Sequence, residues 1–165
     1  MNDTLYELLV SRQNNMQTRL LKALTITFIV LLAAIIFAFF PVFLPVVIIV
    51  GALAYFFVFP RFNIEYEYTL LQQDLDIDII YDKSKRKTAN SFDLREAELI
   101  APASSSRVAA FKTTTVLDYS TQNPADNPYA IIIPLNKNLN KILIQPDEKM
   151  VQHFRNVAPR VTFMD

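Results

Sequence analysis

The chain has 165 residues, with 16 Lys and Arg against 16 Asp and Glu, one His, one Gly and no Cys. A single His and the lack of Cys argue against a structural zinc site and a cysteine nucleophile. The one glycine, Gly51, lies inside an apolar run, so the glycine-rich loops of NTPases and dinucleotide-binding enzymes are absent.

Residues 1–19 are predicted to form an amphipathic helix ahead of this run. Thr4 and Glu7 have the spacing of a capping box at a helix start. We expect the helix to lie on the membrane surface, and a partner-binding helix is the alternative. Apolar residues follow the box at roughly helical intervals: Leu5, Leu8, Leu9, Met16 and Leu20.

Residues 20–60 are predicted to form a transmembrane helical hairpin. Residues 23–60 hold 38 positions without a charged side chain, and one helical crossing needs roughly 20. Pro41 and Pro45 interrupt the run near its middle, so we expect a turn near 41–45 between two helices. A hairpin confined to one leaflet is the alternative, because the turn holds no polar residue.

The second helix of the hairpin carries three small residues. They are predicted to let the first helix approach closely, with dimerisation as the alternative. These residues are Gly51, Ala52 and Ala54.

Cations flank both ends of the apolar run and are absent from its turn. Arg12, Arg19 and Lys22 precede the run, and Arg61 follows it directly. Segments rich in Lys and Arg next to transmembrane helices remain in the cytoplasm. Both termini are therefore predicted to be cytoplasmic, and the chain is predicted to be a multi-pass cell-membrane protein.

Residues 61–165 are predicted to form one cytoplasmic, mainly β domain. Apolar and polar residues alternate through its first half, as in half-buried strands. Asp147 is expected to cap a final helix with Met150, Val151 and Phe154 on its inner face. The strand candidates are residues 63–71, 74–81, 85–92, 94–100, 113–119, 129–135 and 139–144.

The domain offers little for catalysis. His153 is interpreted as a surface or cap residue, and Ser104–Ser106 as part of a loop or the start of a short helix. Asp76 and Asp78 share a strand face, where ion pairing with a basic neighbour strand is favoured over acid–base work or cation binding. We therefore expect no enzyme activity, no cofactor and no metal. With 13 Lys and Arg against 14 Asp and Glu, the domain has no basic field for nucleic acid.

Four cations in five residues are the best binding candidate. We call Lys83, Lys85, Arg86 and Lys87 the basic cluster. Each such cation contributes roughly 1 kcal/mol when it reaches an anionic membrane surface. Membrane orientation, ion pairing with the acidic strand and solubility are the competing interpretations.

The order of about seven antiparallel strands and one carboxyl-terminal helix is that of a pleckstrin-homology (PH)-like fold, so the predicted class is α+β. Six stretches carry a more specific resemblance: Tyr66–Tyr68, Leu75–Asp78, Ser84–Lys87, Ser91–Leu94, Ala101–Ala103 and Pro146–Glu148. Through them the chain resembles a family of small uncharacterised bacterial membrane proteins in which a two-helix hairpin precedes a PH-like domain. The resemblance brings no known activity and no functional residues. We expect the chain to be a membrane-anchored, non-enzymatic module that presents its PH-like domain to a protein or an anionic lipid headgroup. The alternative is a structural accessory subunit of a transporter or channel.

Overall fold

The computed structural model describes residues 5–13, 16–123 and 125–164. The chain forms two compact units. The hairpin unit comprises Asn14–Ile64 with Tyr81–Lys85, and the β unit comprises Met1–Gln13, Glu65–Ile80 and Arg86–Asp165. The α+β class predicted from the sequence is confirmed.

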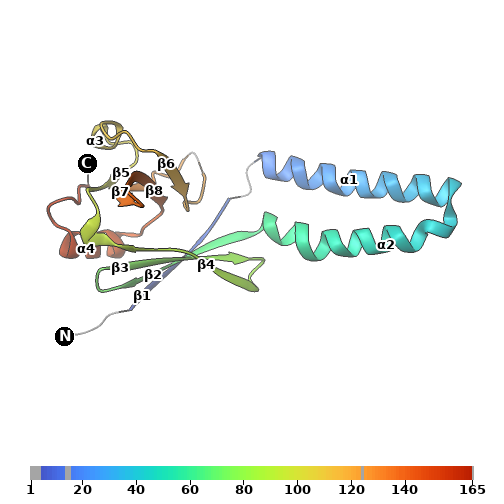
Figure 1. Cartoon of the computed structure of the whole chain (residues 1–165), viewed down its shortest axis with the longest axis horizontal. Helices are drawn as coiled ribbons and strands as arrows, with labels where there is room; N and C mark the ends of the chain where they lie inside the picture. The colour runs from blue at the N-terminus through green and yellow to red at the C-terminus, as the bar shows by residue number, and fades with distance from the viewer. Residues whose placement is uncertain (1–4, 14–15, 124, 165) are drawn as a thin grey trace. The chain divides into compact units, whose positions relative to one another are not determined.

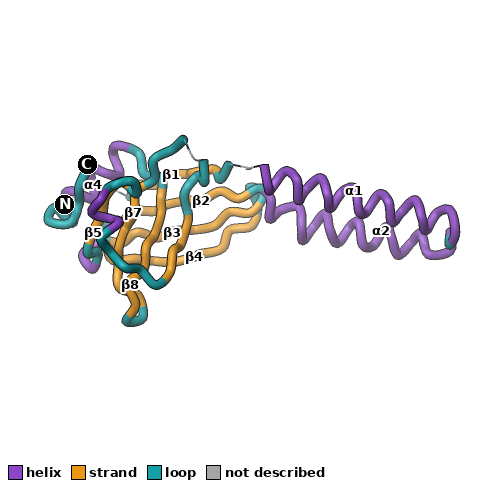
Figure 2. Tube along the Cα trace, turned by 90° about the horizontal axis from the view of Figure 1, so that it is seen from above, coloured by secondary structure: helices purple, strands orange, loops and turns teal. Residues whose placement is uncertain are grey.

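The hairpin unit contains two apolar helices that lie side by side (Figure 1, Figure 2). Helix α1 covers Met16–Phe39, and the short 3₁₀ turn η1 covers Pro41–Phe43. The predicted proline turn is thus confirmed, with Pro45 in the first turn of α2, Leu44–Leu53. The second arm continues as a π-helical turn, η2 (Ala54–Val58), and a 3₁₀ turn, η3 (Phe59–Phe62).

Both arms qualify as membrane spans by length and composition: Thr18–Phe39 and Leu44–Phe62. In the most apolar 18-residue stretch of each arm, 0% of the first arm and 11% of the second arm is buried. Neither arm therefore resembles the buried core helix of a soluble domain. The hydroxyl of Thr25 donates to the carbonyl of Leu21 at 2.9 Å, which satisfies this polar group within the helix.

The two arms meet along a narrow seam. The half-buried residues of α1 recur at intervals of three or four, which is the spacing of antiparallel helix pairs. Val47 and Ala54 of the second arm are buried on the facing side. Gly51 does not serve the close approach that the sequence suggested, because a Cβ there would meet nothing within 4 Å.

The first sheet of the β unit has the strand order β1-β2-β3-β4. Its strands are β1 (Tyr6–Ser11), β2 (Ile64–Leu71), β3 (Asp74–Tyr81) and β4 (Lys85–Asp93). The last three match the predicted segments closely.

Strand β1 corrects the prediction of a helix in residues 1–19. Tyr6–Ser11 pairs antiparallel with β2 from Tyr6 opposite Leu70 to Ser11 opposite Glu65. The expected capping residue Thr4 lies outside the described residues. The first strand of the sheet therefore precedes the hairpin in the sequence, and residues 12–63 form an insertion between two strands that pair with each other.

The second sheet has the order β5-β7-β8-β6. Its strands are β5 (Leu99–Pro102), β6 (Thr115–Asp118), β7 (Tyr129–Leu135) and β8 (Asn138–Ile144). Two details differ from the sequence expectation. Strand β6 runs parallel to β8, and Leu94–Glu96 forms a 3₁₀ turn, η4, because the Asp93 side chain accepts a hydrogen bond from Arg95 N.

The two helices of the β unit begin at side-chain caps. Asp147 caps α4 (Glu148–Val157) by accepting from Met150 N at 2.9 Å, as predicted, and Ser105 caps α3 (Ser106–Ala109). Met150, Val151 and Phe154 of α4 are buried, which confirms their predicted inward face.

Tyrosine hydroxyls connect the two sheets and α4. The fully buried Tyr68 of β2 donates to the carbonyl of Tyr119 at 2.5 Å and accepts from Gln145 N at 3.2 Å, just beyond β6 and β8. Burial raises the pKa of Tyr68 well above its usual range. Tyr6 of β1 donates to Asp147, the cap of α4.

Candidate functional site

The hairpin turn between β3 and β4 carries the start of the basic cluster. Asp82 and Lys83 both have positive φ, 48° and 55°, and Ser84 N donates to the carbonyl of Tyr81 at 3.1 Å. Positive φ at both central residues is the geometry of the tight turn that fits the twist of a hairpin. Glycine is the usual residue at these angles, but this turn has Asp82 and Lys83 at the two positions.

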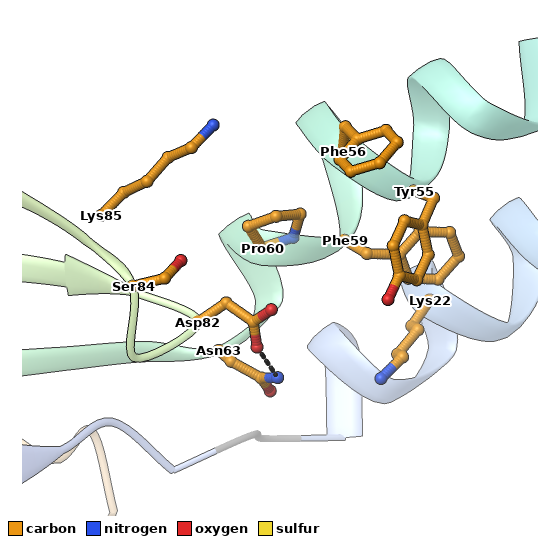
Figure 3. A pocket seen from close by; sticks show the side chains of 9 residues that line it. All are labelled: Lys22, Tyr55, Phe56, Phe59, Pro60, Asn63, Asp82, Ser84 and Lys85. Atoms are coloured by element: carbon orange, nitrogen blue, oxygen red, sulfur yellow. Dashed lines mark hydrogen bonds between the residues drawn. The ribbon is translucent and has the colours of Figure 1, made fainter.

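Two hydrogen bonds fasten this turn to the residue after η3. Asp82 N donates to the carbonyl of Asn63 at 2.8 Å, and the Asn63 amide donates to Asp82 Oδ1 at 3.1 Å (Figure 3). The turn is therefore held against the end of the second apolar arm. Asp82 Oδ2 makes no hydrogen bond or ion pair with the described residues.

Two lysines contact aromatic rings of the second apolar arm. Lys85 Nζ lies 5.7 Å from the centroid of the Phe57 ring, and Lys22 Nζ lies 6.0 Å from that of Phe59. Such contacts contribute about 0.5–1 kcal/mol at exposed sites. Neither lysine forms an ion pair within the described part of the chain, so both charges remain available to a ligand.

A cavity of about 460 Å³ lies among these groups, entirely within the hairpin unit. We call it the hairpin-end cavity. Figure 3 shows polar side chains from the β3–β4 turn on one side of it and aromatic side chains from the second apolar arm on the other. Its lining residues are Lys22, Tyr55, Phe56, Phe59, Pro60, Asn63, Asp82, Ser84 and Lys85.

The structure divides the four residues of the basic cluster by their surroundings. All four are exposed. Arg86 forms an ion pair with Glu67, and its Nε lies 3.7 Å from Asp78 Oδ2. This pairing of a basic strand with acidic neighbours was predicted, although the cation is Arg86 and not a lysine. Lys85 lines the cavity, whereas Lys83 and Lys87 make no ion pair with the described residues.

The remaining sequence candidates have structural roles. His153 Nε2 lies 2.7 Å from the carbonyl of Gln72, whose φ is 54°, so the ring holds the β2–β3 turn. Ser105 caps α3, and Asp78 belongs to the Arg86 network. Over the described ranges, no group of three or more His, Cys, Asp or Glu residues is arranged to hold a metal ion.

Sequence reasoning missed most of the hairpin-end cavity. It used Lys22 only as a topology signal and assigned no binding role to Tyr55, Asn63 or Asp82. The local clue was that Lys22 and Tyr55 sit near the outer ends of the two arms, where charged and aromatic side chains mark a membrane interface. Asn63 and Asp82 line the cavity together because the β3–β4 turn lies against Asn63, although the two residues are 19 positions apart in the sequence.

A family described as "Bacterial PH-like domain (DUF6106)" matches residues 2–164. No curated protein and no solved structure matches the chain. The family match spans the hairpin as well as both sheets, so the inserted arms are part of the family pattern.

Proposed function

Because the chain belongs to the bacterial PH-like domain family, we propose that it is a membrane-anchored, non-enzymatic interaction module. Its apolar hairpin anchors the chain in the cell membrane, and its β unit meets a protein or an anionic lipid headgroup at the cytoplasmic surface. The hairpin-end cavity supports a binding role, because lysines, a carboxylate and aromatic side chains line it together.

One observation carries this proposal: the hairpin is inserted between two strands that pair with each other. Ser11 lies opposite Glu65 in the sheet, so the chain must return to the side from which it entered the membrane. An even number of crossings satisfies this, and so does insertion into one leaflet. Two arms of 22 and 19 residues favour two crossings.

The distribution of cations supports the cytoplasmic side. Arg12 and Arg19 precede the exposed apolar part of α1, Arg61 ends the second arm, and the basic cluster follows. Positively charged flanks of membrane helices stay in the cytoplasm, where the leaflet surface is negative.

Lys83 and Lys87 are the cluster members best suited to an anionic surface, because Arg86 is already paired with acids. The test uses a hairpin-free variant in which Asn-Gly replaces residues 12–64. Replacing Lys83, Lys85 and Lys87 with Gln should weaken its binding to vesicles rich in phosphatidylglycerol. Added salt should weaken binding of the unsubstituted variant in the same way.

The matched control replaces three exposed lysines elsewhere, Lys112, Lys137 and Lys149, and so removes the same charge. If both triple variants lose binding equally, net charge and not the basic cluster is responsible. If neither loses binding at low salt, the lipid part of the proposal is refuted.

A second candidate function, an accessory subunit of a larger membrane complex, is favoured by the open space beside Gly51. Such a position lets another helix approach closely. Purification of the full chain in mild detergent distinguishes the two functions, because a stoichiometric membrane-protein partner would favour the accessory subunit.

A further inference from the structure

We infer that the hairpin-end cavity binds a phospholipid headgroup that carries both a phosphate and a primary ammonium group, as phosphatidylethanolamine does. This inference rests on the proposed membrane anchorage and names a ligand for one site of that module. It concerns Lys22, Asp82 and Lys85, and it does not involve the ion-paired Arg86.

The cavity presents separated charges of both signs. Lys22 comes from α1, whereas Asp82 and Lys85 come from the β3–β4 hairpin, and no ion pair joins any two of them. A purely anionic headgroup would satisfy the lysines and leave a carboxylate beside its own charge. A purely cationic ligand would face two lysines, so a zwitterion complements the set best.

The carboxylate of Asp82 is positioned to accept from an ammonium group. Asn63 holds Oδ1 at 3.1 Å and fixes the orientation of the side chain, while Oδ2 has no partner among the described residues. A primary ammonium offers three N–H donors, and hydrogen bonds to charged groups are the strong ones. A quaternary ammonium has no N–H to donate, so Asp82 would favour the primary amine.

The cavity also has the setting of a lipid site. Its volume of about 460 Å³ lies within the range of roughly 300–1,000 Å³ that is typical of ligand pockets. Tyr55, Phe56 and Phe59 line one side, near the end of the candidate span Leu44–Phe62 (Figure 3). Aromatic side chains at a span end belong at headgroup level, which makes a bilayer lipid the natural source of the headgroup.

The test compares lipids that differ only in the headgroup. The full chain, purified in mild detergent, is titrated with dioleoyl phosphatidylethanolamine, phosphatidylcholine or phosphatidylglycerol, and bound lipid is measured by native mass spectrometry. One charge-assisted hydrogen bond predicts that the ethanolamine lipid binds about tenfold more tightly than the choline lipid.

Two variants separate the two halves of the site. Asp82→Asn keeps an acceptor for Asn63 and suits the positive φ of this position, so the turn should persist. This variant should lose the preference for ethanolamine over choline. Lys85→Gln should weaken binding of all three lipids and keep that preference, while Lys149→Gln, on the exposed side of α4, should change neither.

Equal binding of the ethanolamine and choline lipids by the unsubstituted chain would overturn the inference, as would a preference that survives Asp82→Asn. These results would leave the membrane anchor intact if the full chain still requires detergent for extraction from membranes. Recovery of the chain in the soluble fraction would instead refute the proposed function and this inference together.

Discussion

The strand at residues 6–11 offers the sharpest test of the fold, because a helix and a strand bury different side chains there. In β1, Val10 is 7% exposed and faces the core, whereas Leu9 is 53% exposed. The helix expected from the sequence would group Leu5, Leu8 and Leu9 on one face. Val10→Ala and Leu9→Ala therefore distinguish the two conformations.

The expected size of the effect follows from burial. Val10→Ala removes two buried carbon groups at about 0.8 kcal/mol each and leaves a small cavity, so the loss is about 2 kcal/mol. With a urea dependence of about 2 kcal/mol/M, the unfolding midpoint should fall by about 1 M. Leu9→Ala should change stability by less than about 0.5 kcal/mol.

The assay is urea unfolding of the hairpin-free variant, followed by far-ultraviolet circular dichroism. In that variant Asn-Gly joins Ser11 to Glu65, which already face each other in the sheet, so a two-residue turn can close the pair. A Leu9→Ala loss as large as that of Val10→Ala would refute the strand assignment.

Three further predictions concern single side chains. The hydrogen bond to Asp147 raises the pKa of Tyr6 to about 12, so the stability that this bond contributes should be present below pH ~10 and lost as the pH rises toward 12. The urea midpoint of Tyr6→Phe should therefore lie below that of the unsubstituted protein at pH 8, and the two midpoints should converge above pH 11. Lys83→Asn should stabilise the β3–β4 turn by up to about 1 kcal/mol, because Asn adopts positive φ more readily, and a lower urea midpoint would contradict this. Gly51→Ala should raise the melting temperature of the full chain in detergent, since the added Cβ meets open space and helical Gly costs about 0.5–1 kcal/mol; a lower melting temperature would show that another helix occupies that space.

Most of the secondary structure could be predicted from local pattern. Strands β3 and β7 have the predicted ends, because polar or positive-φ residues such as Gln72 and Asn136 bound the apolar segments. The proline turn and the Asp147 cap are equally local signals. Each depends on residues within a few positions of one another, and this is the range over which sequence periodicity is informative.

The failures arise where distant pairing decides the structure. Tyr6, Leu8 and Val10 alternate as a strand requires. Leu5, Leu8 and Leu9 of the same segment also fit a helical period. Their partner strand begins more than fifty residues later, at Ile64, and sequence order alone does not identify it. The parallel pairing of β6 with β8 is non-local in the same way.

The candidate site was predicted in part. The exposure of the basic cluster and the pairing of one cation with acidic strands follow from alternation and charge. The contact of Lys85 with Phe57, and of Lys22 with Phe59, requires the end of the hairpin to be formed. Lys22, Tyr55 and Asp82 are far apart in the sequence, so local patterns do not show that they line one cavity.

The most direct test of membrane anchorage is cysteine accessibility, for which a chain without cysteine is already suited. Single cysteines replace Val42 in the hairpin turn, Glu7 in β1 and Lys149 in α4, all of which are exposed. With a membrane-impermeant maleimide on intact spheroplasts, we expect labelling of Val42→Cys alone, and labelling of the other two only after lysis. Labelling of Lys149→Cys in intact spheroplasts would contradict the proposed topology.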